Sequence, residues 1–119
     1  MARETIGEAT IGGVTRPIEI DEASGRFELR AGDDVAFMTF RQSGSVLTLI
    51  HTEVPPAFRG QHVGDGMVRA VLDFARARGM TIKPICPFVS AFLQRHPEYG
   101  DLVDPAFGAR QRPPPASGS

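Results

Sequence analysis

The order of apolar and polar positions predicts short strands in the first half of the chain. Residues 14–20, 26–30 and 35–41 mix apolar and polar side chains, and turn sequences rich in glycine and aspartate separate them. Residues 46–54 form the most apolar run, which follows Gln42-Ser43-Gly44-Ser45 as the second arm of a hairpin. These four runs predict an antiparallel meander.

Alternation along the run 46–54 predicts which of its side chains share a face, because successive side chains of a strand point to opposite sides. One face is expected to hold Leu47, Leu49, His51 and Glu53. The other is expected to hold Val46, Thr48, Ile50, Thr52 and Val54. Both sets are apolar in the first half of the run, which is typical of a central strand covered on both sides.

The second half of the chain combines two helices with further extended segments. Residues 63–78 carry apolar side chains at helical spacing, and Gly79 suits the position that ends a helix. Residues 81–85 predict a fifth strand, residues 87–95 a short helix begun by a proline, and residues 99–103 a last strand. A meander followed by a strand, a helix and a parallel strand predicts an α+β fold with a mixed, mostly antiparallel sheet.

Length and charge limit the class of protein. The 119 residues suffice for one domain with a core, and the net charge of −1 gives no basic excess. Binding of nucleic acid through bulk charge is therefore not expected. We assign residues 1–108 to one compact domain and expect residues 109–119, rich in proline, glycine and serine, to be a disordered tail.

The sequence also predicts a compartment. A single cysteine, Cys86, excludes an intramolecular disulfide and suits reducing conditions. Residues 1–10 are polar and acidic, unlike a signal peptide, and no apolar run approaches the ~20 residues that span a bilayer. We expect a cytoplasmic protein with no membrane partner and no metal site.

The glycine-rich stretch before helix 63–78 is the clearest candidate site. It reads Arg59-Gly60-Gln61-His62-Val63-Gly64-Asp65. A turn that opens into a helix gathers backbone N–H groups without partners, and the helix dipole adds partial positive charge. Glycine lets a ligand approach the main chain, and Arg59 adds a cation. Such a turn binds phosphates, although an ordinary glycine-rich loop has the same composition.

The same stretch resembles the acyl-CoA pyrophosphate loop of the GNAT N-acetyltransferase superfamily, whose pattern is Gln/Arg-x-x-Gly-x-Gly/Ala. Three further segments resemble its small, single-domain YjdJ-like members: His51-Thr52-Glu53-Val54-Pro55, Pro84-Ile85-Cys86-Pro87-Phe88-Val89 and Arg95-His96-Pro97-Glu98-Tyr99. The resemblance runs from about Phe27 to Val103. His62 stands where the pattern has glycine, so a side chain that can either donate to a phosphate or point to the solvent occupies the loop.

The resemblance implies a GNAT-like sheet with helices on its faces, in which the fourth and fifth strands separate and acetyl-CoA lies between their ends. The residues that it implies for cofactor binding are Val54, Arg59, Gly60, Gln61, His62, Val63, Gly64 and Asp65. Ligands of such sheets bind at the carboxyl ends of parallel strands, which here lie near Val54 and Cys86.

Three residues are candidates for the chemistry of acyl transfer, which needs a base for the amine and donors for the oxyanion and the departing thiolate. Glu53 lies where GNAT enzymes keep a base or a water-holding acid, or it is a solvated strand-end carboxylate. His51 lies roughly 7 Å away along the strand and either relays a proton or packs in the core. Cys86 is a nucleophile, an acid for the thiolate or a part of the pocket wall.

The resemblance implies a small acetyl-CoA-dependent N-acetyltransferase that acts on a small-molecule or peptide amine. Transfer proceeds by direct attack of the amine, or through an acyl-Cys86 intermediate. Two alternatives from other classes stay open: a CoA-binding module without turnover, and an interaction domain whose loop binds no nucleotide. The sequence leaves the acceptor and the oligomeric state undefined.

Overall fold

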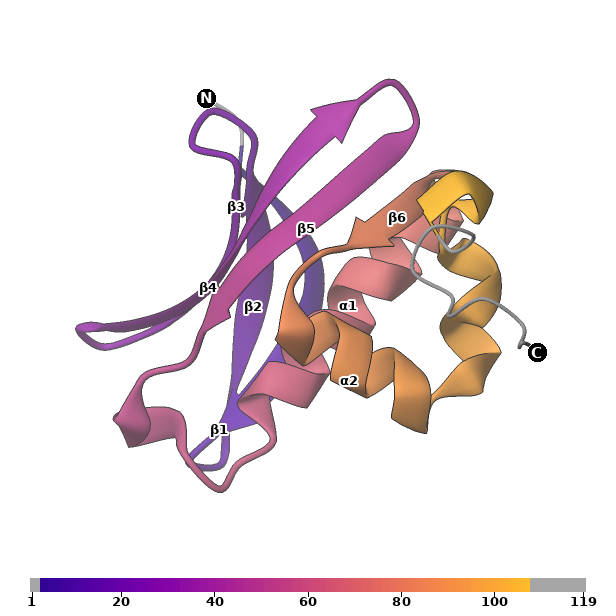
Figure 1. Cartoon of the computed structure of the whole chain (residues 1–119). Coiled ribbons are helices and arrows are strands. Elements are labelled where there is room, and N and C mark those ends of the chain that lie inside the picture. The colour runs from indigo at the N-terminus through magenta and orange to yellow at the C-terminus, as the bar shows by residue number, and fades with distance from the viewer. Residues whose placement is uncertain (1–2, 108–119) are drawn as a thin grey trace.

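The computed structural model describes residues 3–107, which form one curled sheet with helices packed against it (Figure 1). The strands are β1 (Arg3–Ile11), β2 (Val14–Asp21), β3 (Arg26–Ala31), β4 (Asp34–Ser43), β5 (Val46–Glu53) and β6 (Thr81–Pro84). The labelled α-helices are α1 (Val63–Ala77) and α2 (Pro87–Arg95), residues 105–107 are also helical, and the 3₁₀ helices are η1 (Pro56–Phe58) and η2 (Pro97–Leu102).

The strands lie side by side in the order in which they occur along the chain. Each neighbouring pair is antiparallel except β5 and β6, which run parallel because α1 connects them. The predicted α+β class with a mixed, mostly antiparallel sheet is confirmed. The predicted tail, residues 109–119, lies outside the described residues. Within residues 3–107 no helix is long and apolar enough to cross a membrane.

The core lies between the sheet and the helices. Helix α1 buries the apolar stripe that its sequence predicts, and Phe74 meets Phe27 of β3 edge-on, with ring centroids 5.9 Å apart. The helix ends as predicted at Gly79, whose φ is 66°. The N–H of Met80 donates to the carbonyl of Ala75 at 2.8 Å, which satisfies the last turn.

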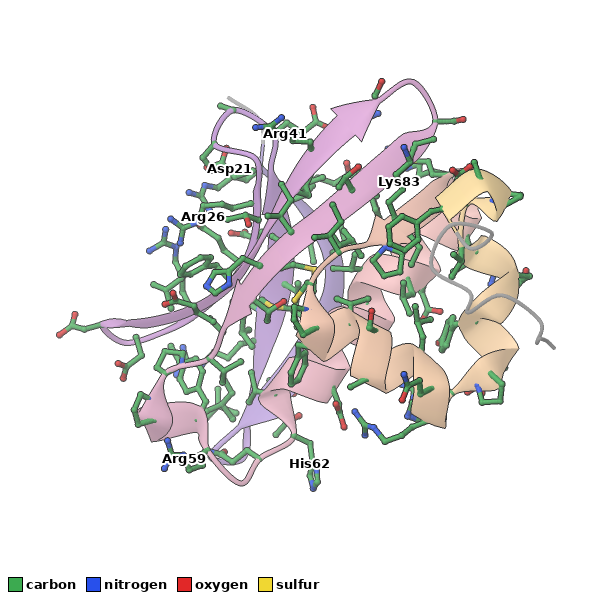
Figure 2. The ribbon with its side chains drawn as sticks, in the orientation of Figure 1. Asp21, Arg26, Arg41, Arg59, His62 and Lys83 are labelled. Carbon is green, nitrogen blue, oxygen red and sulfur yellow. The ribbon has the colours of Figure 1, made fainter. Side chains whose placement is uncertain are left out.

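Both α-helices lie on the core side of the sheet, next to each other (Figure 1). We call the opposite side of β2–β5 the outer face. Figure 2 shows Asp21, Arg26 and Arg41 projecting from it, away from α1 and α2. Among residues 3–107 no helix covers this face over β2–β4. The face is instead covered by charged side chains, which tolerate water.

Strand β1 was not predicted. The sequence analysis placed the first strand at residues 14–20, but residues 3–11 also pair along β2 as an edge strand. Its sequence hides the pattern because glycine replaces a larger side chain where α1 approaches. A Cβ on Gly7 would lie 2.8 Å from the Cβ of Ala70. A bulge between Thr5 and Gly7 also breaks the alternation.

The predicted last strand at residues 99–103 is wrong. The segment forms the 3₁₀ helix η2, and within residues 3–107 only Val103 makes a bridge, to Ile82 of β6. Pro97 suits the first position of a helical turn. Tyr99 is buried against α1 because its hydroxyl donates to Asp73 at 2.9 Å, which holds the segment in this form.

A bulge in β5 overturns the predicted assignment of its faces. Leu49 pairs with Phe40 of β4 and His51 pairs with Thr39, so Ile50 has no partner on β4. One extra residue shifts the alternation by one position. Beyond it His51 and Glu53 lie on the outer face, with 55% and 60% of their side-chain surface exposed, whereas Leu49 is fully buried.

Candidate functional site

A pocket of about 290 Å³ lies where β5 ends and α1 begins. Residues from the end of β5, the following loop and the first turns of both α-helices line it: Val54, Phe58, Arg59, Gly60, His62, Val63, Gly64, Asp65 and Phe88. All the residues that the sequence predicted for cofactor binding therefore line one pocket except Gln61. The sequence analysis did not place Phe58 or Phe88 in this site.

The loop beside this pocket carries a run of backbone N–H groups without a partner. None of the six N–H groups of residues 60–65 donates to an acceptor within residues 3–107. The first one that does is the N–H of Gly66, which bonds to the carbonyl of His62 at 3.0 Å. Gly60 allows this path because its φ is 80°. The geometry is that of an anion-binding helix terminus.

His62 keeps the loop in this form at a cost. Its φ is 57°, and it is the sole non-glycine residue with a positive φ in residues 3–107. A left-handed conformation costs an L-residue about 1–2 kcal/mol. Figure 2 shows its side chain extending outward from the loop. The residue therefore shapes the backbone as glycine would and adds an imidazole at the pocket rim.

Gln61 braces the loop from outside the pocket. Its side-chain oxygen accepts a hydrogen bond of 2.6 Å from the N–H of Gly12, in the β1–β2 turn, and its amide nitrogen donates to the carbonyl of Ala57 at 3.4 Å. The unpredicted strand β1 thus supports the loop. Because Gln61 uses its side chain internally, only its backbone N–H is available to a ligand.

Asp65 brings a negative charge to the first turn of α1, and Arg95 of α2 neutralises it. The two side chains form two hydrogen bonds, of 3.2 and 3.3 Å. These bonds lower the pKa of Asp65 below its usual value, although burial opposes them. The carboxylate would repel a phosphate, so residue 65 can serve an anion only through its N–H, while Arg59 supplies positive charge in the pocket lining.

Gly64 is required by packing. A Cβ at this position would lie 2.5 Å from the ring of Phe88, so the first turn of α2 sits directly on the first turn of α1. Phe88 is 37% exposed and forms an apolar wall of the pocket. The sequence reveals the glycine, but it does not reveal that its neighbour is an aromatic ring 24 residues further along the chain.

Strands β5 and β6 separate beside this pocket. Their pairing ends at Leu49 and Pro84, and the N–H of Cys86 makes the last contact, with the carbonyl of Leu49 at 2.9 Å. Beyond this point β5 continues to Glu53 while the chain turns into α2. A gap between diverging parallel strands is where ligands of α/β units bind.

Cys86 lies on the core side of this gap. Its side chain is 2% exposed, and its Sγ lies 3.3 Å from Oγ1 of Thr52. Within residues 3–107 this hydroxyl is the sole side-chain hydrogen-bond partner of the thiol. A neutral hydroxyl does not turn a thiol into a thiolate, so the structure supplies no base beside the sulfur.

His51 and Glu53 form a pair on the outer face. Nε2 of the imidazole lies 2.9 Å from Oε2 of the carboxylate. Both groups are on the side of β5 opposite to Thr52 and Cys86, because successive side chains of a strand alternate, and the bulge at Ile50 makes their side the outer face. The structure thus brings two of the three predicted catalytic residues together and separates them from the third.

Comparisons with known proteins cover this whole region. The family model described as GCN5-related N-acetyl-transferase matches residues 26–102. Protein NATD1 of Danio rerio is 28% identical over 91 residues, which are 72% of this chain and 83% of the relative. Protein NATD1 of Mus musculus is 27% identical over 110 residues, 88% of this chain and 100% of the relative. Protein NATD1 of Homo sapiens is 26% identical over 93 residues, 74% of this chain and 82% of the relative.

Proposed function

Because this chain belongs to the GCN5-related N-acetyltransferase family, we propose that it transfers an acetyl group from acetyl-CoA to an amine. The observation that supports this function best is the run of N–H groups of residues 60–65 without a partner, five of which belong to residues that line the pocket. Each can make a charge-assisted hydrogen bond to a phosphate oxygen, worth about 1.5–3 kcal/mol.

The residues of the pocket fit a CoA diphosphate. Arg59 adds a guanidinium to the backbone donors, and His62 adds an imidazole at the rim. Val54 and Phe88 give the pocket apolar walls. An anion site beside apolar walls suits a ligand with a charged end and an extended, largely uncharged arm.

The two sides of β5 supply the groups for the reaction. Bound acetyl-CoA would provide an activated acetyl thioester. Glu53, oriented by its hydrogen bond to His51, accepts the proton that the amine nitrogen loses as it forms the amide bond. The C–S bond of the thioester breaks and CoA leaves as the free thiol, with the Cys86 thiol, whose Sγ lies 3.3 Å from Oγ1 of Thr52, as the candidate proton donor.

The separation of these groups favours direct attack by the amine over an acyl-Cys86 intermediate. A cysteine nucleophile needs a neighbouring base or a positive charge that stabilises its thiolate. The His51–Glu53 pair lies on the outer face, whereas Cys86 is buried on the core side beside Thr52. We assign Cys86 to the wall of the gap and to protonation of the leaving sulfur.

Calorimetry with CoA tests the site. Gly60→Asp puts a carboxylate into the row of donors, and we expect it to weaken binding at least about 30-fold by charge repulsion. Gly32→Asp is the matched control, since Gly32 also has positive φ and open space around it but lies in the β3–β4 turn. Equal CoA affinities for the two variants would contradict the diphosphate site.

Release of free CoA thiol in the presence of amines tests the activity. We expect the wild-type protein to release thiol from acetyl-CoA only when an amine is added. A protein that binds CoA but releases no thiol with any amine would be a CoA-binding module without turnover. A protein that binds no CoA would be an interaction domain.

A further inference from the structure

The outer face carries an arginine in line with the proposed base. Arg26 of β3 pairs with Thr39 of β4, and Thr39 pairs with His51 of β5. The three residues form one row across the sheet. Neighbouring strands are about 4.8 Å apart, so the backbones of Arg26 and His51 are about 10 Å apart. One small molecule can reach from one to the other.

A second row lies directly beside the first. Glu28 of β3 pairs with Phe37 of β4, and Phe37 pairs with Glu53 of β5. The Phe37 ring lies between the side chains of Arg26 and His51. Its centroid is 4.0 Å from the guanidinium carbon of Arg26 and 6.3 Å from the imidazole of His51. The aromatic ring therefore holds the guanidinium flat, through a cation–π contact.

The guanidinium of Arg26 is poorly satisfied by the protein itself. Its Nε is buried, and the Arg26 side chain donates no hydrogen bond within residues 3–107. Its contact with Glu28, 3.2 Å from Nε to Oε2, is an ion pair without hydrogen-bond geometry. Arg3 and Arg30 instead donate to Oε1 of Glu28, at 2.7 and 2.9 Å.

The other charges around Arg26 are already paired. Asp21 lies opposite Arg26 on β2, but its carboxylate accepts from Arg3 at 3.2 Å and from the N–H of Ser24 at 3.4 Å. The side chain of Arg26 keeps 32% of its surface exposed. The fork of donors at its end is thus ordered, charged and accessible, which is the arrangement that recognises a carboxylate.

From this geometry we propose that the acceptor is an amine that also carries a carboxylate, and that Arg26 binds this carboxylate while the amine meets Glu53. The inference rests on the proposed acetyl transfer, in which Glu53 on the outer face is the base. Amine and carboxylate must be several bonds apart, since Phe37 separates the two binding groups. An ω-amino acid or a peptide amine near an acidic residue has this form, whereas glycine is too short.

Matched amines test the proposal. 6-Aminohexanoate and hexylamine have similar amine basicity and differ in the carboxylate. We expect kcat/KM for thiol release to be at least about tenfold higher with 6-aminohexanoate, the value of one charge-assisted contact. Glycine and methylamine, which are too short, should show no such preference. Thiol release with the dipeptide glycyl-aspartate tests whether a peptide amine near a carboxylate is accepted as well as a free ω-amino acid is.

Two neighbouring arginines give a variant and its control. Arg26→Gln should abolish the preference for the carboxylate, and Arg26→Lys, which keeps the charge but not the fork, should retain part of it. Arg41→Gln should keep the preference, because Arg41 projects from the same face but pairs with Thr48, farther along the hairpin (Figure 2). CoA affinity should be the same in all three variants.

Each outcome decides between the two proposals. Equal use of both six-carbon amines, or a preference that survives Arg26→Gln, overturns the acceptor assignment and leaves acetyl transfer standing. If the protein shows no turnover, calorimetry measures the binding of the two amines to the CoA-bound protein instead. If 6-aminohexanoate binds better than hexylamine only while Arg26 is present, the anion site stands although acetyl transfer fails. If neither amine binds, the acceptor assignment is wrong.

Discussion

The two sides of β5 beyond Ile50 carry different kinds of chemical groups. The core side and the adjoining pocket offer mainly backbone N–H groups, a hydroxyl and a buried thiol, with Arg59 as the cation of the pocket lining. The outer face offers exposed charged side chains, with His51 and Glu53 paired at 2.9 Å. Strand alternation separates these groups, and the unpaired residue Ile50 decides which of them lie on the outer face.

The difference also concerns how each side keeps its shape. On the core side, close packing fixes the groups, as where the ring of Phe88 leaves no room for a Cβ on Gly64. On the outer face, ion pairs fix them, and Glu28 is the centre because its buried carboxylate contacts Arg3, Arg26 and Arg30. Substitutions on the two sides should therefore affect different measurable quantities.

The largest effect is expected from Glu53→Gln. Loss of a general base slows a reaction by about 10²–10⁴-fold, and we expect a loss of about 10²–10³-fold in the rate of thiol release. CoA affinity should not change, because Glu53 lies on the face opposite to the pocket. Steady-state kinetics and calorimetry measure the two quantities separately.

Glu22→Gln is the control for this variant, since Glu22 is an exposed carboxylate in the β2–β3 turn. A full rate for Glu53→Gln, or an equal loss in both variants, would show that the outer face does not hold the base. The two sides of β5 would then not divide the proposed base from the proposed proton donor.

Glu28→Gln should destabilise the outer face, and with it the fold, by about 2 kcal/mol in urea unfolding. Breaking a buried ion pair costs about 3–5 kcal/mol, and we reduce this figure because the three arginines are partly exposed. Glu19→Gln is the control, because Glu19 lies opposite Glu28 on β2 with 31% of its side chain exposed. Equal losses in the two variants would contradict the central role of Glu28.

The same variant predicts a dependence on pH. Burial is the largest single influence on the pKa of Glu28 and raises it, but the hydrogen bonds from Arg3 and Arg30 and the positive charges of both side chains together lower the pKa below its usual value. A lowered pKa stabilises the fold above the unfolded pKa, and this contribution is lost as pH falls through the folded pKa. The stability difference between wild type and Glu28→Gln should therefore shrink in acid. A constant difference would contradict the shift.

The elements that the sequence predicts are those whose pattern is local. Helix α1 follows from its apolar spacing and Gly79, and the phosphate-type loop follows from Gly60, Gly64 and the resemblance. Strand β1 lacks such a local pattern, because Gly7 stands where an apolar side chain would have revealed the strand. The segment 99–103 reads as a strand because the contact between Tyr99 and α1 is invisible in the sequence.

The faces of β5 could not be predicted for the same reason. A bulge is a property of a strand pair, and nothing in the run 46–54 shows that Ile50 lacks a partner on β4. The sequence thus predicted that His51 and Glu53 share a face, but not that this face is opposite to the one that holds Leu47 and Leu49. Arg26 and Phe37 escaped notice altogether, because only the register of β3, β4 and β5 brings them beside His51.

Cys86→Ala should reduce thiol release less than about tenfold. The variant removes one donor from the core side but leaves Thr52 and the outer-face base in place. Cys86→Ser, which keeps a donor of similar size, should come closer to the wild-type rate. Complete loss of activity, together with acetylation of wild-type Cys86 detected by mass spectrometry, would instead establish the acyl-cysteine route and join the two sides in one mechanism.

The smallest effect concerns the strained residue at the pocket rim. His62→Gly relieves about 1–2 kcal/mol of left-handed strain and loses about 0.4–1 kcal/mol through the freer unfolded chain, so stability should rise by about 0.5 kcal/mol. Gly60→Ala, also at positive φ, should lower it. If the pocket relies on backbone donors, CoA affinity of His62→Gly at neutral pH should stay within about threefold of wild type. A loss above about tenfold would make the imidazole an anchor for the ligand, and the core side would then depend on a titratable side chain as the outer face does.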